Sequence, residues 1–169
     1  GVAAASMVAA LWGWFRPAPP RPVMRYGLAF AEGQLPRGMM ALSPDGAHLY
    51  VVESSLPGVS RLPLRADGTA GPRELVVDMP RTVPDGIAFT VEGLLLITCY
   101  RPDAVFTWDG ASLGTLVEDW SGLMLSAPTN IAFVGSGRDQ LVSANLAGWH
   151  LTRIDAGLVG SPLHHPRIR

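Results

Sequence analysis

A carboxylate in a constrained setting, Asp85, is the first candidate for chemistry in this sequence. It stands between Pro84 and Gly86, directly before the apolar residues 87–89. Proline restricts the backbone on one side and glycine frees it on the other, so the chain itself sets the direction of the carboxylate. An oriented carboxylate can accept a proton or bind a cation. Asp85 is therefore a candidate catalytic residue and a candidate metal ligand.

The pattern around Asp85 occurs twice more in the chain. Residues 36–42 (PRGMMAL) carry Arg37 near their start, and residues 128–133 (PTNIAF) carry Thr129 and Asn130 at the matching place. A pattern that returns along the chain indicates a repeat architecture, in which each copy is one structural unit. Arg37, Thr129 and Asn130 then lie at the entrances of the strands that neighbour Asp85.

The apolar runs that follow these patterns keep a constant period. They begin at residues 48, 94 and 140, an even step of 46 residues. Each is followed by a further strand-like run, and two units carry a weaker fourth one. Four short strands in about 40 to 50 residues make one blade of a β-propeller. The sequence predicts an all-β protein with about three four-stranded blades of an incomplete ring, at about 36–80, 83–122 and 127–166.

Composition excludes several classes of protein. The 169 residues include 19 Gly and 15 Pro, and 48% are hydrophobic, which suits a buried sheet core with many turns. A formal net charge of −1 leaves no basic excess for a nucleic-acid backbone. Cys99, the one cysteine, excludes an internal disulfide and a multi-cysteine zinc site. We expect its thiol to be a small buried group.

Three further residues have structural interpretations. Asp45 lies in Ser-Pro-Asp-Gly, a sequence that favours a hairpin turn, so we expect a turn former and not a ligand. Trp120 and Trp149 are expected to pack between blades, because indole rings bury a large apolar area.

Residues 1–22 form a separate segment, and residues 23–169 form the expected propeller domain. The first fifteen residues are apolar and uncharged, and a proline-rich stretch follows them. A membrane-spanning helix needs roughly 20 apolar residues, so no transmembrane anchor is expected. The run has the length of a signal-peptide core, but no positive charge precedes it. The sequence favours a cytoplasmic protein and leaves export as the alternative.

The motifs at 42–51 (LSPDGAHLYV), 84–89 (PDGIAF), 128–133 and 149–155 (WHLTRID), in this order, resemble the SMP-30/gluconolactonase/LRE family over roughly residues 36–166. The resemblance implies a six-bladed propeller that opens sugar or other small-molecule lactones with a divalent metal. Ca²⁺ is the expected metal, with Zn²⁺ or Mn²⁺ as alternatives. Asp85 matches a family aspartate that binds the metal, and it would also accept a proton.

The match to the family ligands is partial. The family's Asn-Gly motif falls on Arg37-Gly38, and a guanidinium there repels a cation, pairs with Asp85 or contacts the substrate. The family's glutamate ligand belongs to a part of the ring that we do not find in this chain. Thr129 and Asn130 would hydrogen-bond sugar hydroxyls, the alternative being a turn that caps their strand.

Three functions remain open at the level of sequence. The first is a metal-dependent lactone hydrolase, or a fragment of one. The second is a propeller scaffold or binding module with a degenerate metal site, and the third is a propeller that resembles strictosidine synthase. An incomplete ring leaves strand edges open, so self-association through them is a further expectation.

Overall fold

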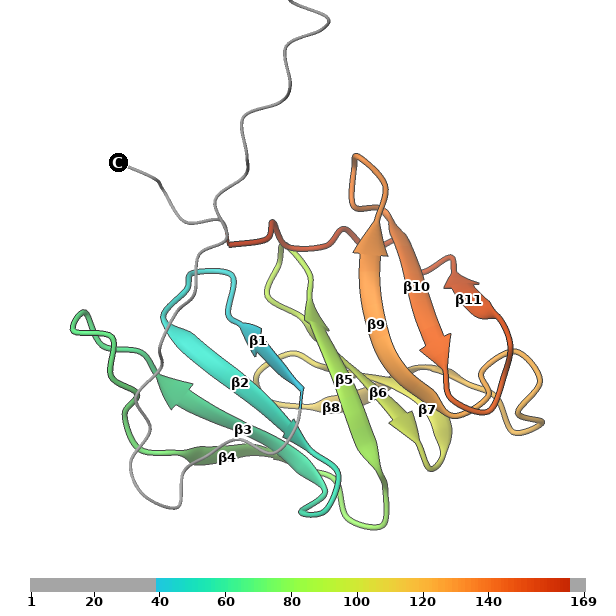
Figure 1. The fold of residues 1–169 in the computed structure, drawn as a ribbon, viewed down its shortest axis with the longest axis horizontal. Coiled ribbons are helices and arrows are strands. Elements are labelled where there is room, and N and C mark those ends of the chain that lie inside the picture. The colour runs from blue at the N-terminus through green and yellow to red at the C-terminus, as the bar shows by residue number, and fades with distance from the viewer. Residues whose placement is uncertain (1–38, 165–169) are drawn as a thin grey trace, which may run out of the picture.

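The computed structural model describes residues 39–164, which form three antiparallel sheets arranged side by side (Figure 1). We call the sheets blades 1, 2 and 3. Blade 1 contains β1 (Met40–Leu42), β2 (His48–Glu53), β3 (Gly58–Pro63) and β4 (Glu74–Asp78). Blade 2 contains β5 (Pro84–Phe89), β6 (Leu95–Tyr100), β7 (Asp103–Trp108) and β8 (Leu113–Glu118). Blade 3 contains β9 (Pro128–Val134), β10 (Gln140–Asn145) and β11 (Leu151–Ile154).

Within each blade, strands that are adjacent in the sequence pair with each other, so each blade is a simple meander. The prediction of an all-β protein with repeated blades is confirmed, and residues 39–164 contain no helix. No helix within this range could therefore span a membrane. The described part of blade 3 has three strands, and the sequence showed a fourth strand-like run only in the other two units. Residues 1–22 and Arg37 lie outside the described residues.

The hairpin turn between β1 and β2 confirms the interpretation of Asp45. Its carboxylate accepts hydrogen bonds from the Ser43 hydroxyl (2.5 Å) and the Ala47 amide (3.0 Å). Gly46 adopts a φ of 71°, which an L side chain rarely takes. The hydrogen bond from Ser43 lowers the pKa of Asp45. Its carboxylate therefore organises the turn.

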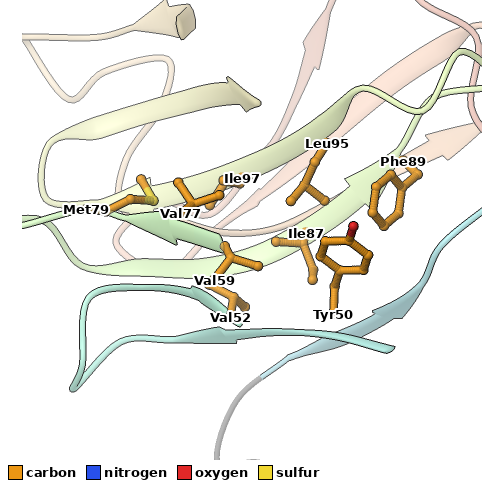
Figure 2. Packing of buried hydrophobic residues seen from close by; sticks show 9 residues of the cluster. All are labelled: Tyr50, Val52, Val59, Val77, Met79, Ile87, Phe89, Leu95 and Ile97. Carbon is orange, nitrogen blue, oxygen red and sulfur yellow. The ribbon is translucent and has the colours of Figure 1, made fainter. Parts of the chain in front are cut away.

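Blades 1 and 2 share a hydrophobic core, which Figure 2 shows from close by. Tyr50 of β2 meets Phe89 of β5 edge to face, with ring centroids 5.0 Å apart. Leu95 and Ile97 of β6 point into this core, whereas Leu96 between them points to a second core shared with blade 3. Blade 2 is thus covered on both faces, which explains why β6 is an unbroken apolar run.

A segment after β11 connects the three blades. This strap, residues 155–164, runs along the upper edge of the sheets in Figure 1. It contacts the first hairpin turn of every blade. The contacts are a hydrogen bond between the His164 ring and the Ser43 carbonyl (2.8 Å), a β-bridge between Thr90 and Gly160, and a hydrogen bond from the Arg138 guanidinium to the Gly160 carbonyl (2.9 Å).

Candidate functional site

Asp85 is the second residue of β5, at the end of the sheets opposite the strap. Strand β9 of blade 3 packs against β5 and begins at the same end (Figure 1). Pro84 is fixed from two sides. Its carbonyl accepts a hydrogen bond from the Ser54 hydroxyl of blade 1 (2.7 Å), and it pairs with Cys99 of β6. The backbone that carries Asp85 is therefore held by two blades.

Gly86 allows blades 2 and 3 to approach closely beside Asp85. A Cβ atom at Gly86 would lie 2.6 Å from the Thr129 carbonyl oxygen and 2.7 Å from the Asn130 Cα. The Gly86 amide donates to the Thr98 hydroxyl at 2.8 Å. Gly86 is not among the glycines with positive φ. The glycine of Pro-Asp-Gly is thus required for space, and not for the backbone freedom that the sequence suggested.

Burial changes the acidity of Asp85. Its side chain is partly buried, and burial raises the pKa of its carboxyl above the ordinary value. A raised pKa makes a carboxylate a stronger proton acceptor. Glu53, a buried carboxylate of blade 1, has a charged partner. It forms an ion pair with Arg73, and Arg73 also donates a hydrogen bond to the Ser60 hydroxyl (3.0 Å). Glu53 is therefore a structural residue.

Thr129 and Asn130 meet the backbone of Gly86, so the structure brings them to the strand that carries Asp85. Thr129 is partly buried and Asn130 is exposed. The Asn130 side-chain oxygen accepts a hydrogen bond from the Ile131 amide (2.8 Å), a local contact of the strand-capping kind. Its amide nitrogen takes no part in that bond. Arg37, the remaining predicted substrate-binding residue, lies outside the described residues.

The described residues do not form a complete metal site. Residues 39–164 contain no cluster of three or more His, Cys, Asp or Glu that could hold a metal ion. A hard cation such as Ca²⁺ takes six to eight oxygen ligands. Asp85 supplies one carboxylate, so the donor set within this range does not fit a metal without additional ligands.

Cys99 is a structural thiol, as the sequence predicts. It is buried, its thiol donates to the Arg101 carbonyl (2.9 Å), and its sulfur accepts from the Val83 amide (3.3 Å). Burial raises the pKa of Cys99, so the unreactive protonated form is favoured. Cys99 and Ser54 therefore position the residues before Asp85, and Thr98 positions Gly86 after it. The sequence analysis did not identify these two hydroxyls, because their partners lie on distant strands.

The predicted packing of Trp120 and Trp149 between blades is wrong. Their exposed fractions are 95% and 106%. Both residues lie on loops beyond the ends of the strands, where nothing within residues 39–164 covers them. Leu125, on the same loop as Trp120, fills the core between blades 2 and 3 instead.

Residues 30–144 match the model of the family described as SMP-30/Gluconolactonase/LRE-like region. Regucalcin from Agrobacterium tumefaciens, described as a calcium-binding protein, is a structural neighbour with 19% identity and a TM-score of 0.62 over 76% of this chain and 49% of that one. A luciferin-regenerating enzyme has 20% identity and a TM-score of 0.57 over 73% of this chain and 42% of that one. A gluconolactonase from Xanthomonas campestris has 21% identity and a TM-score of 0.54 over 64% and 34%.

At these identities the likeness to solved structures concerns the fold. The chain spans between about a third and a half of the length of these structures. The search of curated proteins finds no match. The family model covers the Pro-Asp-Gly motif at Asp85 and the motif at Thr129 and Asn130. The chain therefore belongs to the SMP-30/gluconolactonase/LRE-like family.

Proposed function

We propose that this chain is part of a lactone hydrolase in which Asp85 accepts the proton of the attacking water. The partly buried Asp85, held where blades 2 and 3 meet and given a raised pKa by burial, is the observation that supports this function. Family membership provides the reaction class.

The proposed reaction is a hydrolysis with balanced proton transfers. The water oxygen bonds to the lactone carbonyl carbon as Asp85 takes a water proton. The ring C–O bond then breaks, and the proton passes from Asp85 to the leaving alkoxide, which gives a hydroxy acid. Thr129 and Asn130 are proposed to hydrogen-bond hydroxyl groups of a sugar lactone. No step is assigned to a metal, because the described residues lack a complete ligand set.

The test compares lactone opening by the 169-residue chain and by Asp85→Asn. The assay uses δ-gluconolactone, alone and with added Ca²⁺, Zn²⁺ or Mn²⁺. Loss of a general base lowers the rate about 10²- to 10⁴-fold, and we expect a decrease of at least about 100-fold. Asp45→Asn is the matched control. Asp45 stands in a second Pro-Asp-Gly tripeptide, but its carboxylate organises a turn near the strap. Equal rates for wild type and Asp85→Asn would contradict the proposal.

A binding module without catalysis is the second candidate. It is favoured by the incomplete ligand set, since residues 39–164 provide Asp85 but no acidic or histidine cluster. Under this alternative, calorimetry with each of the three cations shows no binding, and the wild-type chain opens lactone no faster than Asp85→Asn.

A further inference from the structure

Two connecting loops lie side by side at the end of the sheets that carries Asp85. The first, residues 119–127, links β8 to β9, and the second, residues 146–150, links β10 to β11. The Leu146 amide donates to the Ala127 carbonyl (2.9 Å), and the Ala147 amide donates to the Ser126 carbonyl (3.1 Å). We call this pair of loops the double loop.

The first loop is organised around the carboxylate of Asp119. This carboxylate accepts hydrogen bonds from the hydroxyl and amide of Ser121 and from the amides of Gly122, Met124 and Leu125. These bonds hold the pKa of Asp119 well below its usual range, with the Ser121 hydroxyl as the largest cause. Leu125 is almost fully buried between blades 2 and 3. The loop is therefore fixed both by polar contacts and by an apolar anchor.

The second loop is tied to the first by side chains. Asn145 accepts a hydrogen bond from the Ser126 amide (3.2 Å) and donates to the His150 carbonyl (3.1 Å). The His150 ring meets the Met124 carbonyl at 3.1 Å, and the Thr152 hydroxyl donates to the same carbonyl. These hydrogen bonds hold the two loops together as one structural unit.

This fixed unit exposes large apolar side chains. Their exposed fractions range from 67% to 106%, and they belong to Trp120, Leu123, Met124, Leu146 and Trp149. Residues 120–127 and 146–149 contain no charged side chain. Exposed apolar groups gathered on one part of a surface mark sites of interaction. Because charge is absent here, an apolar ligand fits the surface better than an ionic one.

The double loop lies next to the strand that packs beside Asp85, and this position suggests which ligand it binds. Its first loop continues directly through Pro128 into Thr129 and Asn130, whose backbone packs against Gly86 beside Asp85. A small molecule whose reacting ring lies at Asp85 would extend over this continuous stretch. We propose that the double loop binds the alkyl substituent of a lactone whose ring reacts at Asp85. The part of this inference that makes the ligand a lactone rests on the proposed function.

The affinity of the 169-residue chain is measured by calorimetry for two lactones with the same six-membered ring. They are δ-valerolactone, which is unsubstituted, and δ-decalactone, which carries a pentyl group. Each fully buried methylene contributes about fourfold in affinity. We expect δ-decalactone to bind at least about tenfold tighter than δ-valerolactone. The factor is smaller than for five fully buried carbons, because the pentyl group is only partly desolvated on an open surface.

The double variant Trp120→Ser/Trp149→Ser should reduce this preference to about twofold or less. Leu163→Ser is the matched control, because Leu163 is an equally exposed apolar residue of the strap at the opposite end of the sheets. This control should keep the wild-type preference. Circular dichroism should show the same fold for all three proteins, since the substituted side chains are exposed.

Three results would overturn the inference. The first is equal affinity of the wild type for the two lactones, and the second is an unchanged preference in the double variant. The third is concentration-dependent dimerisation in sedimentation that the double variant abolishes, which would assign the surface to contact between copies. Binding is measured separately from hydrolysis. An alkyl preference in a protein that opens neither these two lactones nor δ-gluconolactone would refute the proposed function and retain the binding surface.

Discussion

Blades 2 and 3 contain corresponding strands with different surroundings. In β6 of blade 2, Leu95 through Cys99 are completely buried. In β10 of blade 3, Leu141 and Ser143 are buried, whereas Val142 and Ala144 between them are only partly covered. Blade 2 has a neighbour on each face, and the described residues cover blade 3 on its blade 2 side.

The two sequences reflect this difference. Strand β6 reads LLITCY and β10 reads QLVSAN. A strand covered on both faces tends to be continuously apolar, while a strand covered on one face alternates. The repeat therefore fixes where a strand runs, and the apolar pattern within it reports how many of its faces are covered.

The largest expected effect tests this difference directly. Leu96→Ala removes a fully buried side chain from the core between blades 2 and 3, and it should lower the free energy of unfolding by about 2–5 kcal/mol. Val142→Ala, at the corresponding position of β10, should cost about 1 kcal/mol or less because its side chain is only partly covered. Urea denaturation of both variants measures the difference. Equal losses would show that the second face of β10 is as well packed as that of β6.

A second test concerns the contact between the two blades. Gly86→Ala places a methyl group against the backbone of Thr129 and Asn130, which cannot move away as a flexible side chain can. We expect a loss of about 1–3 kcal/mol in the free energy of unfolding, measured by urea denaturation.

Gly137→Ala is the control for this clash. The added Cβ would meet only the Asp139 side chain, at 3.3 Å or more, so the change should stay within about 0.5 kcal/mol. If Gly86→Ala is equally mild, blades 2 and 3 can separate locally beside Asp85 without loss of stability.

The regular part of the fold was predictable because the signals are local. The 46-residue period placed strand starts at 48, 94 and 140, and β2, β6 and β10 begin at 48, 95 and 140. Alternating and continuous apolar runs depend on backbone geometry and on burial, and both leave a pattern in the sequence. Asp45 was assigned to a turn for the same reason, since its hydrogen-bond partners are two residues away.

The remaining features depend on contacts between distant residues. The strap has no period, and its bond from His164 to Ser43 joins residues 121 positions apart. Trp120 and Trp149 have the residue type of a core, but their loops lie beyond the strand ends. The space restriction at Gly86 comes from blade 3, which no feature of Pro-Asp-Gly indicates. Sequence patterns report the strand to which a residue belongs. They do not report which distant segments contact the ends of that strand.

The smallest expected effect concerns charge at the second residue of β5 and of β9, where blade 2 has Asp85 and blade 3 has the neutral Thr129. Burial raises the pKa of Asp85, so its ionised form disfavours folding. Asp85→Asn should therefore raise the free energy of unfolding at pH 7, by less than about 1 kcal/mol for a partly exposed group. The advantage should disappear as the pH falls through the raised pKa to below 3.8, where both proteins are neutral at this position.

Asp109 provides a control of opposite sign. Hydrogen bonds from the Ser112 and Ala111 amides lower its pKa, so its ionised form favours folding. The stability it contributes is present above pH 3.8 and is lost as the pH falls through the lowered value. Asp109→Asn should then be less stable than wild type at pH 7. Urea midpoints between pH 3 and 7 distinguish the two carboxylates, and the same sign for both variants would mean that burial does not set the acidity of Asp85.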